Sequence, residues 1–137
     1  MTPEQFEQEV VQRFPMLADK VAENRGLLHV IMGDLYRYTQ EQLSARRWSE
    51  MDRVFRLLDE AYTASRKTTS EIENAIRVSF LEYFEFGGHE GQIRELLGPS
   101  LAELYDDQMR YMEDLARIAA EQRDAGGSDK HNRHSEK

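Results

Sequence analysis

The sequence predicts an all-α protein, and three observations support that prediction. Apolar residues recur three to four positions apart in successive segments of the chain, which is helical spacing. Capping residues, glycines and prolines separate these segments. No run of alternating β-branched residues occurs, so we expect no sheet. The predicted architecture has about six helical segments, in a compact helical bundle or a short stack of antiparallel, HEAT-like helix pairs.

The first two helices have clear boundaries. Thr2 and Gln5 have the spacing of a capping box, and a proline stands between them at the first helical position. This helix should end near Phe14, because Pro15 disfavours helical geometry in the residue before it. Pro15 then begins a second helix, which Gly26 ends.

Two longer helices are expected at 27–45 and 49–65. The first contains Gly33, which lowers local helix propensity and is interpreted as permitting close packing or a kink. Ser49 is a candidate cap for the second helix. Both segments repeat apolar residues with helical periodicity, so each should bury one face.

The most apolar helix is predicted at 70–85, after a polar turn at 66–69. Ser70 and Glu73 repeat the capping-box spacing at its start. Three glycines within 86–91 should end it. A short helix and the last long helix follow, separated by a Gly-Pro pair. The expected antiparallel pairs are 49–65 with 70–85 and 91–97 with 99–122.

Composition predicts one domain and a tail. Of the 137 residues, 39% are hydrophobic and 32% are charged, which is enough apolar material for a core that needs no cofactor. We expect a single helical domain at 1–123. The segment 124–137 has no aliphatic residue beyond Ala125, so it should be a disordered polar tail.

The absence of cysteine excludes disulfides, thiolate metal sites and cysteine nucleophiles. The N-terminal sequence lacks the basic and apolar regions of a signal peptide, and no stretch is apolar enough to span a bilayer. We therefore expect a cytoplasmic protein that does not bind membranes.

Acidic residues are concentrated in the C-terminal half of the expected domain. Residues 68–123 hold twelve Asp and Glu against five Lys and Arg, whereas residues 1–67 hold eleven against ten. An acidic surface attracts basic proteins and repels nucleic acid and anionic membranes. The sequence thus favours a basic protein partner, although acidity that serves only solubility is an open alternative.

The last predicted helix carries the candidate binding surface. Its acidic side chains are expected to form a ridge that meets arginines or lysines of a partner, and a solvated helix face is the alternative. Trp48, at a helix junction, is a candidate interface anchor or a core residue. The predicted partner-binding residues are Glu103, Asp106, Asp107, Glu113, Asp114 and Trp48.

No group of residues predicts catalysis, a metal site or a cofactor. His131 and His134 are three residues apart, but in a polar tail we expect them to be solvated and not to bind a metal ion. Neighbouring carboxylates such as Asp59 and Glu60 point about a third of a turn apart on a helix and rarely converge on one substrate. The glycine-rich loop at 87–91 lacks the Lys-Ser/Thr of a phosphate-binding loop. We expect that the protein is not an enzyme.

Short apolar stretches carry a resemblance to a known family. They are LLHVIMGDL at 27–35, and IRVSFLEY at 76–83 followed by LLGP at 96–99, after an opening helix that ends in Arg-Phe-Pro. In this order they resemble a family of small bacterial helical proteins of uncharacterised function, over about residues 5–115.

The resemblance implies a function but no catalytic residue. Members of that family are similar to small proteins encoded near polymorphic toxins, which implies an immunity protein that blocks a basic toxin such as a nuclease. The positions that match are interpreted as structural. They are His29, Gly33, Asp34, Ser79, Glu82, Gly98 and Pro99.

Three hypotheses follow from the sequence. The leading one is a binding protein whose acidic C-terminal helices meet a basic partner. The second is a structural or adaptor protein that self-associates, as a homo-oligomer, through an apolar helix face. The third and least favoured is a small-ligand sensor with a pocket around His29, Asp34, Tyr36 and Glu82.

Overall fold

Helices account for most of the described part of the chain. The structure, a computed structural model, describes residues 1–65 and 71–135. No strand occurs within these two ranges, so the predicted all-α fold without a sheet is confirmed. The predicted turn at 66–69 and the predicted cap Ser70 lie outside the described residues.

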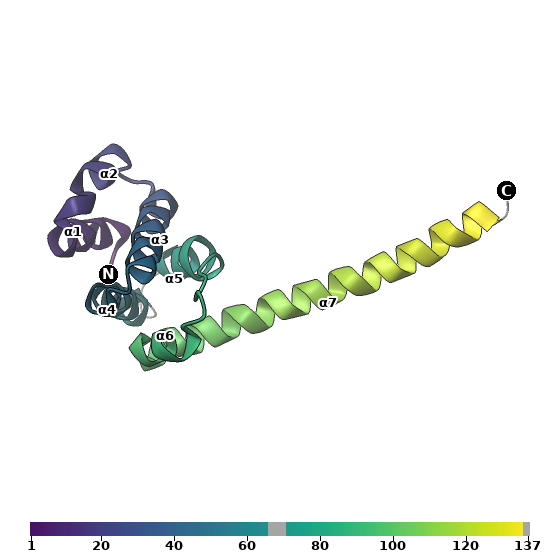
Figure 1. Ribbon diagram of the computed structural model, residues 1–137. Coiled ribbons are helices and arrows are strands. Elements are labelled where there is room, and N and C mark those ends of the chain that lie inside the picture. The colour runs from purple at the N-terminus through teal and green to yellow at the C-terminus, as the bar shows by residue number, and fades with distance from the viewer. Residues whose placement is uncertain (66–70, 136–137) are drawn as a thin grey trace. The chain divides into compact units, whose positions relative to one another are not determined.

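Seven α-helices, one short 3₁₀ helix and one π-helical turn follow one another in the described ranges (Figure 1). Most of the helices begin within a few residues of the predicted positions. They are α1 (Pro3–Arg13), η1 (Pro15–Leu17), α2 (Ala18–Glu23), α3 (Leu28–Ser44), α4 (Trp48–Ser65), α5 (Glu71–Ile76), η2 (Arg77–Leu81), α6 (Glu90–Leu96) and α7 (Pro99–Ser135).

The chain divides into two units, each described by itself. Unit 1 spans Met1–Tyr105 and unit 2 spans Asp106–Lys137. Unit 1 contains every element up to the first turns of α7, and unit 2 contains the rest of α7. The division falls ahead of residue 123, where composition predicts the end of a single domain.

The start of α1 confirms the predicted capping box. The backbone N–H of Gln5 donates to Thr2 Oγ1 at 3.1 Å, and the Thr2 N–H donates to Gln5 Oε1 at 2.8 Å. Two donors that a helix start leaves unpaired are thereby satisfied. At the other end, Phe14 leaves the helix before Pro15, and its ring is fully buried against Tyr38 at 5.5 Å between centroids. The predicted second helix begins as the 3₁₀ turn η1 and continues as α2.

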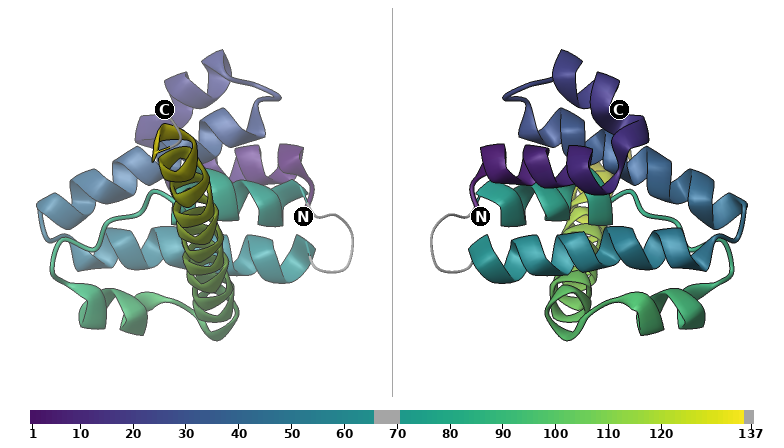
Figure 2. Two further views of the ribbon diagram at one scale, coloured as in Figure 1. Left: turned by 90° about the vertical axis from the view of Figure 1, so that its right-hand side faces the viewer. Right: turned by 90° about the vertical axis from the view of Figure 1, so that its left-hand side faces the viewer.

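The core of unit 1 lies where α3 packs against α4, α5 and η2. α4 and α5 also pack on each other and run side by side in opposite directions (Figure 2), as the sequence predicts for 49–65 and 70–85. α4 begins at Trp48, so Ser49 lies inside the helix and the prediction that it caps the helix is wrong. The second expected pair is not formed within unit 1, where α6 packs against α4.

An aromatic cluster fills this core. Phe80 stacks on Phe84 at 5.7 Å and meets Phe55 edge-on at 6.2 Å. Phe84 meets Phe86 at 5.3 Å, and Phe86 meets Tyr105 at 5.2 Å. Such ring pairs add to the stabilisation that burial of the rings provides. The cluster thereby links η2 to α4 and to the first turns of α7.

The predicted helix at 70–85 is shorter and less regular than expected. After α5 the backbone enters the π turn η2, in which the N–H of Glu82 donates to the carbonyl of Arg77. A π turn accommodates one more residue than an α turn and rotates the residues that follow. Phe80 and Leu81, which are adjacent in sequence, are both buried. The π turn thus occurs where these two side chains pack in the core, and the apolar periodicity of the sequence does not predict it.

The junction before α7 requires a glycine. The carboxylate of Asp59, on α4, accepts a hydrogen bond from the N–H of Leu101 at 3.0 Å and caps the start of α7. A Cβ placed on Gly98 would lie only 2.6 Å from the carboxyl carbon of Asp59. Gly98 is therefore a close-packing glycine, and one carboxylate of the Asp59-Glu60 pair is a helix cap.

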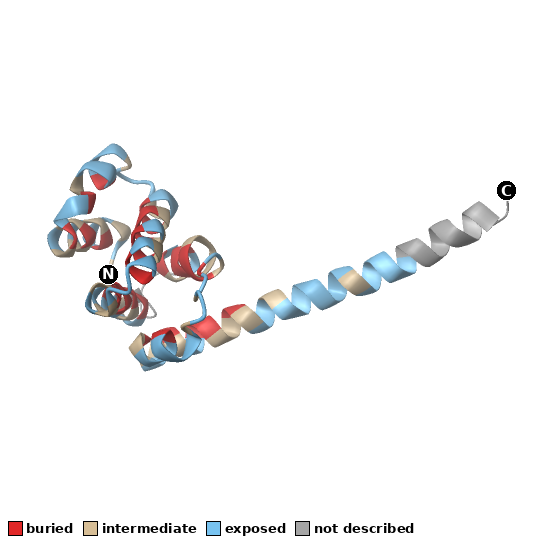
Figure 3. Cartoon of the chain, in the orientation of Figure 1, coloured by how far each residue is buried: buried red, intermediate tan, exposed pale blue. Residues whose placement is uncertain are grey.

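α7 is longer than the sequence predicts. The last helix is expected to end near Gln122, but α7 continues to Ser135. No proline follows Pro99, and two consecutive glycines weaken a helix by about 1 kcal/mol each without excluding it. Burial decreases along this helix, and the residues from 113 to 119 are all exposed (Figure 3). The disordered tail at 124–137 stays a prediction for solution experiments.

Candidate binding sites

The first candidate site is an exposed apolar stripe on α7. Tyr111, Leu115 and Ile118 are 56%, 44% and 45% exposed. Their spacing of four and then three residues places them on one side of the helix. The described residues of unit 2 contain no second element that could cover this side of the helix.

An acidic row borders this stripe. Asp107, Asp114 and Glu121 are seven residues apart, so they lie on one side of α7, and we call them the inner acidic row. Asp114 is three residues after Tyr111 and four before Ile118, which makes it a helical neighbour of both. The inner acidic row therefore forms one edge of the apolar stripe.

The predicted ridge is divided by two arginines. Arg110 pairs with Asp107, and Arg117 pairs with Asp114 at 3.1 Å. These arginines stand between the inner acidic row and a second row, Asp106 and Glu113, which we call the outer acidic row. Glu113 and Asp114 are exposed, whereas Asp106 and Asp107 are half-buried. Their binding role stays a prediction, but only the inner row borders apolar surface.

The remaining predicted residues belong to unit 1. Trp48 is half-buried, and its ring meets His89 edge-on at 5.2 Å. Glu103 is exposed on the first turns of α7. The indole of Trp48 is thus partly packed and partly accessible, and its role as an interface anchor stays a prediction.

The second candidate site is a hollow between α3 and η2 of unit 1. Its volume is about 330 Å³, near the lower limit for small-molecule sites. His29 Nδ1 and Ser79 Oγ are 2.8 Å apart across it, and the Tyr36 hydroxyl donates to the carbonyl of Tyr83 at 3.0 Å. The lining residues are His29, Gly33, Tyr36, Arg37, Ser79 and Tyr83.

Only part of this hollow was predicted. His29 and Tyr36 line it, whereas Asp34 does not. Asp34 is buried and accepts hydrogen bonds from Arg37 at 2.5 Å and from Asn24 at 3.3 Å. Glu82, the fourth expected residue, does not line it. Ser79 and Arg37 were missed as site residues, because only the fold brings η2 beside α3. The paired Ser79 and His29 are adjacent groups of the type found in acyl transfer, but in the described residues no carboxylate orients the imidazole.

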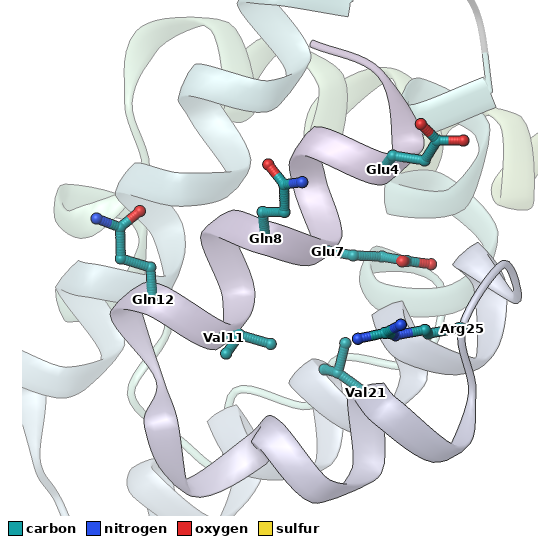
Figure 4. Close-up of a pocket in the computed structure, with 7 residues that line it drawn as sticks. All are labelled: Glu4, Glu7, Gln8, Val11, Gln12, Val21 and Arg25. Atoms are coloured by element: carbon teal, nitrogen blue, oxygen red, sulfur yellow. The ribbon is translucent and has the colours of Figure 1, made fainter.

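Another hollow lies between α1 and α2, and its volume is about 510 Å³ (Figure 4). Glu7 and Arg25 extend toward each other there, and Glu7 Oε1 accepts the backbone N–H of Gly26 at 2.8 Å. That bond holds the turn after α2, where Gly26 has a φ of +80°. We interpret this carboxylate as structural. The hollow is lined by Glu4, Glu7, Gln8, Val11, Gln12, Val21 and Arg25.

The groups whose pKa values are clearly shifted lie where α1, α3 and α4 pack together. Burial, together with the hydrogen bond to Glu50 at 2.6 Å, raises the pKa of Tyr38 to about 12. The bonds from Tyr38 and Arg53 lower the pKa of Glu50. Burial acts to lower the pKa of Arg13, but its contacts with Glu60 and Glu9 outweigh that effect and raise it. These groups are structural, since each shift arises from a bond that joins neighbouring turns or helices.

Among the described residues, no cluster of three or more His, Asp or Glu is placed to hold a metal ion. No helix in those residues is long and apolar enough to cross a membrane. The side chains of His131 and His134 lie outside the described part.

The described residues form an all-α protein with an exposed apolar stripe on α7 and a hollow between α3 and η2. Comparison with known families matches residues 7–120 to the family described as "Domain of unknown function (DUF7674)". Because the match covers most of the chain, this protein belongs to that family. Comparisons with curated proteins and with solved structures found no match.

Proposed function

We propose that this chain is a cytoplasmic protein-binding module whose α7 receives an amphipathic helix with a basic edge. The exposed stripe of Tyr111, Leu115 and Ile118 is the observation that supports this proposal most directly. Exposed apolar groups arranged along one helix side are typical of helix-in-groove or coiled-coil recognition. Tyrosine also provides the amphipathic ring that often anchors protein interfaces.

The inner acidic row specifies the charge of the partner. Asp107 and Asp114 now pair with Arg110 and Arg117, but exposed pairs of this kind contribute at most about 1 kcal/mol each. A partner's lysine or arginine can therefore replace or extend them when the apolar faces dock. Charge of this kind mainly accelerates association, while the apolar contact determines how long the complex lasts.

A second copy of the chain fits this surface less well. If two α7 helices paired antiparallel, their inner acidic rows would face each other and repel. If they paired parallel, the inner row would meet the opposite edge of the stripe, where Met112 and Ala119 offer no positive charge. The self-association hypothesis therefore ranks below binding of a basic partner.

Within this proposal, the narrower function is that of an immunity protein. An acidic helical protein suits a basic toxin, because complementary charge speeds capture and specifies orientation. The resemblance to proteins encoded near polymorphic toxins also supports the function of an immunity protein. In that case the apolar stripe would contact the toxin surface, and the inner acidic row would meet its basic residues.

The test uses two synthetic helical peptides that share a leucine stripe but carry either lysines or glutamates along its edge. We expect the lysine peptide to bind the full chain, as measured by fluorescence anisotropy. Leu115→Ser with Ile118→Ser should weaken this binding at least tenfold, or about 1.4 kcal/mol. The stripe is exposed, so circular dichroism should show an intact fold.

The charge requirement is tested with a matched pair of variants. Asp107→Lys with Asp114→Lys should slow association of the lysine peptide, whereas Asp106→Lys with Glu113→Lys should slow it much less. Equal effects would mean that the peptide responds only to net charge, and the docking surface would be rejected. A cross-linker at position 111 can then identify the natural partner in lysate of the source cells, with the Leu115/Ile118 variant as control.

A further inference from the structure

Gly33 occupies a position where the fold does not need a glycine. It lies inside α3, where glycine is less favourable than alanine because its backbone loses more freedom. A Cβ at Gly33 would meet nothing closer than 3.8 Å, an ordinary contact distance. Gly98 differs, since its Cβ would collide with Asp59 at 2.6 Å. The interpretation of Gly33 as a close-packing residue is therefore not supported by the space around it.

The space beside Gly33 adjoins a guanidinium group that is held in place. The atoms nearest to the Cβ position are Arg37 Nη1 and Nη2, at 3.8 and 3.9 Å. Arg37 Nη2 donates to Asp34 Oδ1, and this carboxylate is buried, whereas the Arg37 side chain is 59% exposed. The ion pair thus fixes the guanidinium from below and leaves other N–H donors for a ligand.

Hydrogen-bonding groups face the same hollow from two elements. His29 comes from the first turn of α3, and Ser79 comes from the π turn η2. Because the Ser79 hydroxyl engages Nδ1, the imidazole is held while Nε2 has no partner among the described residues. π turns occur often at functional sites. None of the lining residues is acidic, so the hollow suits a negatively charged group.

Two tyrosines supply the apolar part of the hollow. The Tyr36 and Tyr83 rings are 6.3 Å apart, and Tyr83 is 59% exposed. The bond from the Tyr36 hydroxyl to the Tyr83 carbonyl fixes one ring. An aromatic ring of a ligand would gain edge or offset contacts with both.

We propose that the hollow between α3 and η2 binds a small aromatic carboxylate. Its carboxylate meets the guanidinium of Arg37 beside Gly33, with His29 and Ser79 as further hydrogen-bonding partners, and its ring lies against Tyr36 and Tyr83. The guanidinium fork matches the planar geometry of a carboxylate. This site does not depend on the protein-binding role of α7.

The test titrates benzoate into the full-length protein and follows backbone amides by NMR. Acetate and benzyl alcohol serve as controls that lack the ring and the carboxylate, respectively. We expect saturable shifts at residues 29, 33, 37 and 79 with benzoate, and weaker binding of both controls. No saturable shift at these residues with benzoate would overturn the proposal, and so would acetate binding as tightly as benzoate.

Gly33→Ala separates the site from the fold. The methyl group should raise Tm, because alanine favours the helix and meets no clash, yet weaken benzoate binding about tenfold or more by filling the space beside Arg37. Gly91→Ala in α6 is the control, since its Cβ would meet nothing within 4 Å, and it should leave binding unchanged. Arg37→Lys keeps the charge but loses the fork, and it should weaken binding as well. Unchanged benzoate affinity in both Gly33→Ala and Arg37→Lys would contradict the proposed site.

Discussion

At the residue scale, three glycines of this chain have different roles. Gly98 lies against the carboxylate that caps α7, Gly33 leaves space beside a guanidinium, and Gly91 lies in a helix with open space around it. From the sequence alone, all three are expected only to weaken or end a helix. Their differences depend on which atoms the fold places within a few ångströms of each absent Cβ.

Gly98→Ala is expected to destabilise unit 1 by about 1–3 kcal/mol. The new methyl must displace the Asp59 carboxylate from its hydrogen bond with the N–H of Leu101, so α7 loses its cap. Urea unfolding measures the change. Gly91→Ala is the matched control, and it should be neutral or stabilise by up to about 1 kcal/mol. A neutral Gly98→Ala variant would mean that Asp59 does not hold the start of α7.

At the element scale, α3 is joined to α4 by both polar and apolar contacts. The Tyr38 hydroxyl bonds Glu50, and Arg53 both pairs with Glu50 and lies over the ring of Phe14 at 5.1 Å. Arg53 also donates to the carbonyl of Arg13 at the end of α1. One group of side chains thus connects α1, α3 and α4. Apart from the i,i+3 pair of Glu50 and Arg53 on α4, none of these contacts is predicted by sequence spacing, because their members come from separate elements.

The Tyr38–Glu50 bond makes stability depend on pH in the alkaline range. Because the folded-state pKa of about 12 exceeds the ordinary value of 10, the unfolded chain loses this proton first as the pH rises. The stability from Tyr38 is complete below pH 10 and is lost as the pH rises through 12. Urea unfolding of the wild type and Tyr38→Phe should therefore show a difference at pH 8 that becomes smaller at pH 11.

In the acid range, the carboxylate of Glu50 gives stability the opposite dependence on pH. The pKa of Glu50 is lowered in the folded state, so its contribution is present above the ordinary pKa and is lost as the pH falls through the lowered one. Glu50→Gln should remove this part of the acid sensitivity. A Tyr38→Phe difference that stays constant from pH 8 to 11 would exclude the coupling.

At the scale of the whole molecule, burial is concentrated in unit 1. The largest fully buried side chains, from Phe6 to Phe80, all belong to it. Unit 2 consists of one helical segment, and an unpacked helix of this length is only marginally stable in water. The two units should therefore differ in local stability.

Hydrogen exchange measures that difference. We expect amides of unit 2 at 111–125 to exchange orders of magnitude faster than those of α3 and α4, since their opening requires no disruption of a core. The tail at 124–137 should be unprotected. Protection of 111–122 equal to that of α3 would mean that the stripe is covered, and its dependence on protein concentration would distinguish a second copy from packing within one chain.

The sequence by itself determined the helical class, most helix boundaries and the pairing of 49–65 with 70–85. These features depend on interactions over a few residues, such as the capping box at Thr2 and the stop at Pro15, or on the periodicity of one segment. The sequence also shows that the last helix is acidic. The separation of its acidic residues into two rows became clear only from the positions of Arg110 and Arg117 around the helix.

Only the tertiary structure decided the roles of the remaining residues. It exposed the stripe at Leu115 and Ile118, introduced a π turn at 77–81, and brought Ser79 beside His29 from fifty residues away. The physical reason is that burial and contact across helices depend on which elements pack together, whereas sequence spacing reports only the face of one helix. An apolar face looks the same in sequence whether the fold covers it, as at Phe80, or leaves it open, as at Ile118.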